Sequence, residues 1–286
     1  QVGCLSRRLD LGRLPGTDRP SGRPGCQRHD AAGGRRVPRI MRAIVTGAAH
    51  GFGRAICQTL ASHGARVWAL DIVEQELAET ARLCMAEGGW CEARVLDITR
   101  PQAVQALVAE IGAAGPPVAI LVNNAGITHK IAIESETLDM FEETMEVNTT
   151  AIWHLCKLAG ENMVANRSGV IVNVASILGM IAGTPIKQAN YAASKGAVIA
   201  LSREIAVQWA RKGVRVNSLC PGWFVSEMTA GMDTDDSSQK YVMQNSPIPR
   251  MGAEHELDGA LLFMVSDASS FMTGQSVIVD GGWTAR

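Results

Sequence analysis

The sequence predicts an α/β fold, a single domain with a doubly wound parallel sheet of about seven strands covered by helices on both faces. Two observations support this prediction. After Met41, short apolar runs alternate with longer stretches of helical periodicity, as in parallel sheets whose strands are joined by helices. The chain has 286 residues, of which 47% are hydrophobic and 19% charged, an ordinary composition for one large globular domain.

The expected elements follow one another in a regular order. We expect strands at 43–45, 66–70, 90–96, 118–122, 170–174, 214–219 and 276–279. Helices are expected at 53–63, 74–87, 101–111, 137–166, 191–211 and 254–265. A Ser/Asp-rich segment over 221–249 interrupts the alternation, and neither a second domain nor an internal repeat is evident.

The first forty residues differ in composition from the rest. They contain nine arginines and three aspartates, so their charge is +9 − 3 = +6, and they carry seven glycines and four prolines. No apolar period or signal-peptide core runs through them, and we expect a disordered or non-native extension. A basic arm for an acidic partner and a transit peptide are alternatives. We favour Met41 as the natural start, with residues 41–286 as the one folded domain.

Composition also argues against several function classes. A net charge of −1 gives no support for a nucleic-acid partner. Seven cysteines without a C-x-x-C pair or a histidine at zinc spacing indicate free thiols, no metal site and a cytoplasmic protein. The longest apolar run, Val170 to Ala182, is too short to cross a membrane.

A glycine-rich turn follows the first expected strand and opens a helix. Its sequence is Thr46-Gly47-Ala48-Ala49-His50-Gly51-Phe52-Gly53, with the spacing G-x-x-x-G-x-G. In this context glycines let backbone N–H groups approach a pyrophosphate, and the helix N-terminus stabilises its negative charge. The turn therefore predicts a dinucleotide site, although a plain glycine-rich βα turn has the same appearance.

Asp71 directly follows the second expected strand. A carboxylate there can accept hydrogen bonds from both hydroxyls of an adenosine ribose and repels a 2′-phosphate, which favours NAD over NADP. NADP remains an alternative, because His50 or Arg54 can partly neutralise a phosphate. Asp71 can equally serve as an N-cap for the next helix.

Further polar residues stand at strand ends or inside a helix. Asp97 ends the third strand, where it can meet an adenine edge or simply close a turn. Asn123 to Gly126 ends the fourth strand and suits a tight turn under a ligand. Asn148 lies within a long helix, where a buried amide needs a partner. Ser176 follows the fifth strand, usually a plain turn position.

A tyrosine and a lysine lie four residues apart at the start of the helix at 191–211. On a helix, Tyr191 and Lys195 share one face, so both can point into one cleft. A nearby ammonium favours the phenolate and is expected to lower the pKa of the tyrosine. Such a pair suits proton transfer to or from an alcohol or ketone oxygen. A solvated helix face is the alternative interpretation of this pair alone.

Taken together, these motifs make the chain from Met41 to its C-terminus resemble a short-chain dehydrogenase/reductase with a Rossmann-type fold. The features that match the family pattern in order and spacing are 46–53, 123–126, Asn148, Ser176, Tyr191 with Lys195, Pro221-Gly222, and the ending from Gly274-Gln275 to Asp280-Gly281-Gly282.

The resemblance implies a role for each catalytic residue. Tyr191 is the general acid/base, and Lys195 binds the nicotinamide ribose and lowers the tyrosine pKa. Ser176 hydrogen-bonds the substrate oxygen, and Asn148 holds a water that relays protons to solvent. The cofactor contacts implied are Gly47, His50, Gly51, Phe52, Gly53, Asp71, Ile72, Asp97, Ile98, Asn124, Ala125, Gly126, Tyr191, Lys195, Pro221, Gly222, Phe224 and Ser226.

Two positions depart from the family pattern. Ser226 replaces a usual threonine but keeps the hydroxyl. Phe52 replaces a smaller aliphatic residue, and we expect it to crowd the pyrophosphate turn without excluding the cofactor.

The expected reaction is hydride transfer between NAD(P) and a secondary alcohol or ketone. The run 221–228 is similar to the gluconate 5-dehydrogenase and 3-oxoacyl-carrier-protein reductase branch, so the expected substrate is a small molecule: a polyol, sugar or sugar acid. The alternatives are an NADPH-dependent 3-oxoacyl-carrier-protein reductase, for which Lys130, Arg167 and Arg250 are candidate carrier contacts, and a non-catalytic nucleotide-binding protein. The segment 223–249 is the expected substrate loop.

The family resemblance also implies a homotetramer. It is expected to form through the helices at 137–166 and 191–211 and through the last strand. The helix at 191–211 agrees with this expectation, since it is apolar on more than one face and must be buried by more than its own sheet.

Overall fold

The computed structural model describes residues 41–183, 186–225 and 236–286. Within them, seven strands form one parallel sheet in the order β3-β2-β1-β4-β5-β6-β7. The strands are β1 Arg42–Thr46, β2 Arg66–Asp71, β3 Trp90–Val95, β4 Ile120–Asn123, β5 Gly169–Val174, β6 Val214–Pro221 and β7 Ser276–Val279. The fold class and the seven expected strands are confirmed, with ends shifted by up to two residues.

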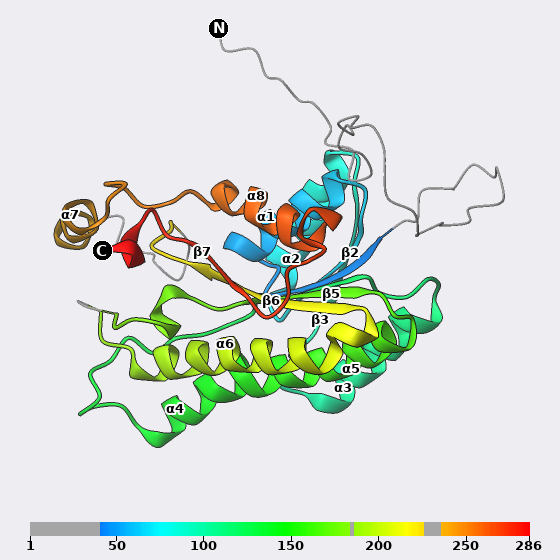
Figure 1. Ribbon diagram of the computed structural model, residues 1–286, viewed down its shortest axis with the longest axis horizontal. Helices are drawn as coiled ribbons and strands as arrows, with labels where there is room; N and C mark the ends of the chain where they lie inside the picture. Colours follow the sequence, from blue (N-terminus) through cyan, green and yellow to red (C-terminus); the bar gives the residue numbers. More distant parts are fainter. Residues whose placement is uncertain (1–40, 184–185, 226–235) are drawn as a thin grey trace, which may run out of the picture.

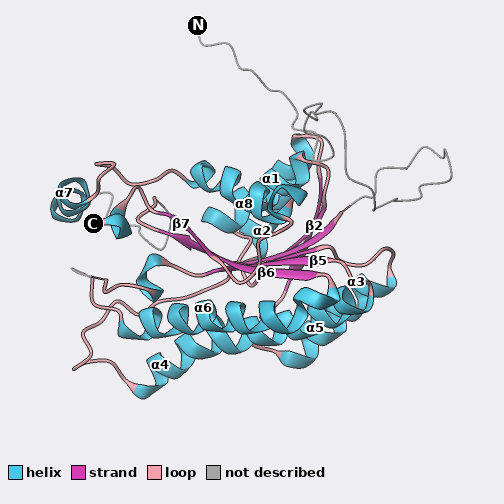
Figure 2. Ribbon diagram, viewed as in Figure 1, coloured by secondary structure: helices cyan, strands magenta, loops and turns pink. Residues whose placement is uncertain are grey.

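Helices cover both faces of the sheet, as Figures 1 and 2 show. Helices α1, α2 and α8 lie on one face, and α3, α4, α5 and α6 lie on the other. Helix α7 lies apart from both layers, close to the C-terminus (Figure 1). The bounds are α1 Gly51–Ser62, α2 Glu74–Ala86, α3 Pro101–Ala113, α4 Leu138–Met145, α5 Ala151–Ala165, α6 Ala189–Trp209, α7 Asp236–Asn245 and α8 Asp258–Val265.

The central strands of the sheet are buried on both faces. In β1 every residue is buried, and in β4 every residue is buried as well. Their side chains divide into two apolar clusters, one under α1, α2 and α8 and one under α3, α5 and α6. Strands packed in this way appear in a sequence as continuous apolar runs instead of alternating patterns.

The long helix expected at 137–166 has an internal irregularity. A π-helical turn, Glu146–Thr150, joins α4 to α5. Thr137 begins α4 by accepting a hydrogen bond on its side chain from the Met140 N–H at 3.3 Å. The π turn inserts an extra residue and rotates Asn148 into the protein, where its side chain is fully buried.

Two other expectations were incomplete. The helix expected at 254–265 begins as a 3₁₀ turn, Glu254–Leu257, before α8. Helix α7 was not expected, because its sequence is polar and lies within the Ser/Asp-rich segment. The arginine-rich extension and residues 226–235 of the expected substrate loop lie outside the described residues.

The order of the strands places the site. The chain winds outward from β1 through β2 to β3, then returns to build β4 to β7 on the other side of β1. The connections leave β1 and β4 in opposite directions, so a crevice opens at the carboxyl ends of these two strands. In open α/β sheets, ligands bind at such a reversal of strand order.

Candidate active site

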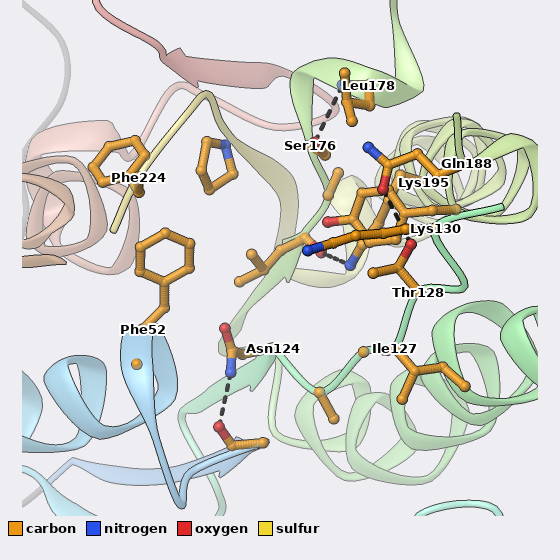
Figure 3. A pocket seen from close by; sticks show the side chains of 18 of the residues that line it. Phe52, Asn124, Ile127, Thr128, Lys130, Ser176, Leu178, Gln188, Lys195 and Phe224 are labelled. Atoms are coloured by element: carbon orange, nitrogen blue, oxygen red, sulfur yellow. Dashed lines mark hydrogen bonds between the residues drawn. The ribbon is translucent and has the colours of Figure 1, made fainter. Parts of the chain in front are cut away.

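A cleft of about 840 Å³ runs along the carboxyl ends of the strands. Its wall includes residues that follow β1, β2, β4, β5 and β6, together with the start of α6. This volume is within the range of small-molecule and cofactor sites. Figure 3 shows the cleft from close by, with Phe52 and Phe224 at one end and Ser176, Gln188 and Lys130 at the other.

The end near β1 is built from glycines that have no room for a side chain. Gly47 has φ +64°, and a Cβ there would lie 2.6 Å from the Ala125 Cα. A Cβ on Gly53 would lie 1.8 Å from the Gly47 carbonyl oxygen. Any larger residue must therefore displace the backbone, so the turn keeps its N–H groups open to a ligand at the N-terminus of α1.

A hydrogen-bonded joint ties this turn to the end of β4. The Thr46 hydroxyl accepts from the backbone N–H groups of Asn124 and Ala125 at 3.0 and 3.1 Å. In return, the Asn124 side chain donates to the carbonyls of Thr46 and Gly47 at 3.1 and 2.9 Å. The Asn124 amide is thus a structural clamp that holds the two strand ends together under the cleft.

Asp71 lines the cleft at the end of β2. Its carboxylate accepts hydrogen bonds from the N–H groups of Ala49, Ile72 and Val73 at 2.7–3.1 Å. The carboxylate is thereby fixed beside the glycine-rich turn. Arg54, considered as a phosphate ligand from the sequence, instead donates to Glu76 at 2.9 Å and to the Ala49 carbonyl at 2.6 Å.

The other end of the cleft brings together Ser176, Tyr191 and Lys195, as the sequence predicted. The Ser176 side chain faces the Tyr191 phenol closely enough to lower its pKa, and the Ser176 hydroxyl oxygen accepts a hydrogen bond from the Leu178 N–H at 3.1 Å. The Lys195 Nζ lies 5.5 Å from the centroid of the Tyr191 ring and donates to the Val174 carbonyl at 2.7 Å. All three residues are buried, Lys195 being only 3% exposed.

The pKa values in this cluster differ from the sequence-based expectation. Burial raises the pKa of Tyr191 to about 12, and the hydrogen bond to Ser176 lowers it by a smaller amount. Burial likewise lowers the pKa of Lys195 to about 8. The expected depression of the tyrosine pKa by Lys195 is absent because the ammonium faces the ring and the Val174 carbonyl, while the low-dielectric surroundings penalise the phenolate.

Asn148 lies behind this cluster and does not line the cleft. Its side-chain oxygen accepts from the Ile127 N–H at 2.8 Å, and its amide donates to the Ile127 carbonyl and the Ser194 hydroxyl, both at 2.9 Å. A Cβ on Gly126 would lie 3.2 Å from the Asn148 oxygen and 3.4 Å from the Lys195 Nζ. The side chain therefore positions the 126–127 backbone, and its role in a water relay stays a prediction.

Most of the expected cofactor contacts converge on the cleft. Those that line it are Gly47, His50, Gly51, Phe52, Asp71, Asn124, Ala125, Gly126, Tyr191, Lys195, Pro221, Gly222 and Phe224. Phe52, expected to crowd the turn, packs edge-on against Phe224 with ring centroids 5.3 Å apart. Ser226 lies outside the described residues.

Four expected contacts do not line the cleft. Gly53 lies directly beneath the turn, and Ile72 is 67% exposed. Ile98 is buried in the apolar cluster under α3, α5 and α6. The Asp97 carboxylate accepts from the Thr99 N–H and hydroxyl at 2.9 and 2.6 Å and from Arg100 at 3.2 Å, so it closes the turn before α3. Adenine binding by Asp97 stays a prediction.

Sequence reasoning missed several residues of the substrate wall. They are Ile127, Thr128, His129, Ile131, Met140, Ile177, Leu178, Ile186 and Gln188. Lys130 and Trp223 were considered only for a carrier patch and a substrate loop, and both line the cleft. The sequence offered one signal for these wall residues, namely that they lie near the Asn-Asn-Ala-Gly motif or near Tyr191. It could not show which of them face the cleft, because side-chain directions in irregular segments cannot be derived from spacing.

The described residues contain no group of three or more His, Cys, Asp or Glu side chains arranged to hold a metal ion. Over the same part of the chain, no helix is both long and apolar enough to cross a membrane.

Comparison with known proteins agrees with this geometry. Residues 47–284 match the family model described as enoyl-(acyl carrier protein) reductase. Galactitol 2-dehydrogenase (L-tagatose-forming) of Cereibacter sphaeroides is 38% identical over 85% of this chain and 94% of its own length. The 3-oxoacyl-[acyl-carrier-protein] reductase of Salmonella typhimurium is 32% identical over 84% of this chain and 96% of its own.

A solved structure extends the similarity to the whole fold. The gluconate 5-dehydrogenase of Burkholderia cenocepacia J2315, crystallised with NADP and tartrate, is 33% identical. It superimposes with a TM-score of 0.82 over 86% of this chain and 96% of that chain.

The parallel sheet has a glycine-rich turn where its strand order reverses, and Ser176, Tyr191 and Lys195 lie in the same cleft. This combination defines a nicotinamide-dependent oxidoreductase. The chain belongs to the short-chain dehydrogenase/reductase family, whose members act on CH–OH groups with NAD(P). The residues present fit this cofactor, because Gly47 and Gly53 leave the turn open to a pyrophosphate and Asp71 stands where a ribose would lie.

The burial of Tyr191 predicts an unusual phenol titration. The chain has two tyrosines, Tyr191 and Tyr241. We expect absorbance at the phenolate band, followed by stopped-flow pH jump, to show a phenol with a pKa of about 12 that Tyr191→Phe removes and Tyr241→Phe retains. An unfolded tyrosine titrates near ~10, so the stability that the buried neutral phenol contributes is lost as pH rises above that value, and the measurement must precede unfolding.

A pKa of ~10 or below for the Tyr191 phenol would contradict this expectation. It would support the sequence-based prediction that Lys195 lowers the pKa of Tyr191.

Proposed function

We propose that this enzyme interconverts a polyol, sugar or sugar acid and the corresponding ketone. The observation that carries the proposal is the convergence of Ser176, Tyr191 and Lys195 at the end of a cleft whose wall also holds Thr128, Gln188 and Lys130. Thr128 and Gln188 are hydrogen-bonded to each other at 3.1 Å. Hydroxyl, amide and ammonium groups on one wall suit a substrate with several hydroxyl groups.

In the proposed mechanism the three residues act on the substrate oxygen. The Ser176 hydroxyl donates a hydrogen bond to that oxygen, and Tyr191 accepts the alcohol proton in oxidation and returns it in reduction. The bound nicotinamide supplies the hydride acceptor or donor. Burial raises the pKa of Tyr191 in this structure, so the phenol is protonated and suited to donate a proton in reduction, and oxidation requires added positive charge near the phenol.

The proposed cofactor is NAD, held at its pyrophosphate by the turn after β1 and at its adenosine ribose by Asp71. Two contacts support NAD over NADP. The Asp71 carboxylate is fixed by three backbone N–H groups, so it is not free to turn away from a 2′-phosphate. Arg54 is engaged by Glu76 and the Ala49 carbonyl.

The 3-oxoacyl-carrier-protein reductase alternative depends on a basic patch near the cleft mouth. Of its three candidate residues, only Lys130 lines the cleft. Arg167 lies beyond α5, near the amino end of β5, and donates to the Arg211 carbonyl at 3.2 Å. Arg250 is paired with both oxygens of Glu256 at 2.7 Å. These positions favour a small substrate over a carrier protein.

The proposed assembly is a homotetramer formed through α4, α5 and α6 and through β7. Large apolar side chains on these elements remain exposed in the single chain. Trp153 on α5 is 48% exposed, Val207 on α6 is 74% exposed, and Ile278 on β7 is 41% exposed. Burying such groups in an interface would remove them from water.

The proposed reaction is tested with a panel of polyols, sugars and sugar acids, with 3-oxoacyl thioesters included, and with NAD and NADP in parallel. We expect turnover of at least one polyol, sugar or sugar acid. Tyr191→Phe should lower kcat by about 100- to 10,000-fold. Tyr241→Phe is the matched control, since Tyr241 does not line the cleft, and it should keep near wild-type kcat.

No turnover of any polyol, sugar or sugar acid would overturn the substrate proposal, and turnover of the thioesters alone would select the alternative. An active Tyr191→Phe enzyme would overturn the role of the tyrosine.

Charge at residue 71 is expected to set the choice of nucleotide. We expect fluorescence titration to show tighter binding of NADH than of NADPH, and Asp71→Asn to shift the ratio of dissociation constants toward NADPH by roughly tenfold, because a repulsive charge is removed. Glu79→Gln is the control, a carboxylate on α2 that does not line the cleft. An unchanged ratio in Asp71→Asn, or wild-type preference for NADPH, would contradict the proposal.

Light scattering after size-exclusion chromatography is expected to give a mass of four times the 30.5 kDa chain. Val207→Glu should lower this mass, since it places a charge in the proposed interface. Met85→Glu, on the opposite helix layer and 54% exposed, should leave the mass unchanged. A monomeric wild type would overturn the tetramer.

A further inference from the structure

One irregular segment, residues 127–131, supplies a continuous part of the cleft wall. It leaves the cofactor end after Gly126 and passes the start of α6, where Tyr191 lies. Thr128 and Lys130 are two residues apart in this segment, and both side chains belong to the wall. Figure 3 shows the Lys130 side chain directed into the cleft on the side where Thr128 and Gln188 lie.

Two buried asparagines fix the backbone of this segment. Asn148 binds both the N–H and the carbonyl of Ile127, at 2.8 and 2.9 Å. Asn190 does the same for His129, accepting from its N–H at 3.3 Å and donating to its carbonyl at 2.9 Å. Both asparagine side chains are fully buried. Asn190 directly precedes Tyr191 in α6, and it holds the backbone of His129, the residue before Lys130. The position of the Lys130 backbone is therefore fixed relative to Tyr191.

The Lys130 ammonium has no partner among the described residues. Its side chain is exposed in the cleft wall and makes no hydrogen bond or ion pair there. Its neighbour differs, because His129 is hydrogen-bonded to Glu143 at 2.9 Å. The other lysine of the wall, Lys195, is buried and donates to the Val174 carbonyl.

The charge of the described wall is unequal along its length. Its one carboxylate is Asp71, at the adenosine end. The end beside Tyr191 contains Lys130 and Lys195 and no acidic side chain among the described lining residues. A carboxylate-bearing substrate is therefore attracted to this end, whereas a neutral polyol gains nothing from the charge.

We propose that Lys130 is a specificity-determining residue that binds the carboxylate of a sugar acid, so the preferred substrate is a hydroxy acid of the aldonate class instead of a neutral alditol. This inference rests on the proposed function, because it names the substrate class of the same cleft. In this arrangement Lys130 binds the carboxylate, and Ser176 and Tyr191 bind the carbinol that reacts. The distance between these two contacts then determines which hydroxyl of the substrate is oxidised.

The test compares D-gluconate with D-glucitol, which share six carbons and differ at the terminal carboxylate. Binding of each compound to the protein–NADH complex is measured by calorimetry, and turnover with NAD is measured alongside. We expect gluconate to bind more tightly than glucitol and Lys130→Met to weaken gluconate binding by roughly 10- to 100-fold, as for a lost charge-assisted hydrogen bond. In turnover, KM for gluconate should rise while kcat changes little.

Three comparisons separate recognition from a structural effect. Glucitol binding should be the same in wild type and Lys130→Met, and Lys130→Arg should restore most of the gluconate affinity. Lys187→Met is the matched control, an exposed lysine close to Gln188 that does not line the cleft, and it should behave as wild type.

Equal loss for both compounds in Lys130→Met, wild-type gluconate affinity in that variant, or no gluconate binding to the wild-type complex would overturn the proposal. These outcomes are distinct from failure of the proposed function. If the enzyme turns over neutral polyols but not aldonates, the proposed function stands and the carboxylate site at Lys130 is overturned. If the enzyme turns over neither polyols nor aldonates, the proposed function itself is overturned.

Discussion

The joint between β1 and β4 is the constraint on which the rest of this site depends. The two strands are neighbours in the sheet, but the chain leaves them in opposite directions. Their ends stay together because four hydrogen bonds join Thr46 and Gly47 at the end of β1 to Asn124 and Ala125 after β4. The glycines at 47 and 53 then allow the first turn to lie against this joint with no side chain between them.

A second level of organisation connects this joint to the start of α6, where Tyr191 and Lys195 lie. The chain that continues from β4 is held at Ile127 by Asn148 and at His129 by Asn190. Asn148 can reach Ile127 because the π turn between α4 and α5 directs it inward. The cofactor end, the substrate wall and Tyr191 are thereby parts of one hydrogen-bonded unit. Buried amides suit this purpose, since each satisfies a backbone donor and acceptor that water cannot reach.

Burial shifts the pKa values of Tyr191 and Lys195, which line the same end of the cleft, in opposite directions. It raises the pKa of Tyr191 to about 12 and lowers that of Lys195 to about 8, so each neutral form is favoured relative to water. Positive charge added to the cleft would favour the Tyr191 phenolate, whereas negative charge would favour the Lys195 ammonium. The low-dielectric surroundings also strengthen every electrostatic contact made there.

Pattern and spacing were sufficient to predict the seven strands, the dinucleotide turn and the Ser176–Tyr191–Lys195 cluster. Each depends on local chemistry: continuous apolar runs form buried strands, only glycine tolerates the close approach at 47 and 53, and residues 191 and 195 share a helix face. Helix α7 was missed because its polar sequence carries no apolar period, and the π turn because a single extra residue leaves periodicity almost unchanged.

Only the tertiary structure decided where other side chains point and what surrounds them. The Asp97 carboxylate accepts a hydrogen bond from Thr99, and Arg54 donates one to Glu76. Lys130 lines the cleft, whereas Arg167 lies beyond α5. The tertiary structure also reversed the expected direction of the Tyr191 pKa shift, because burial penalises the charged phenolate. Local sequence thus determined the fold and the reactive groups, whereas packing between distant segments set their partners and their electrostatics.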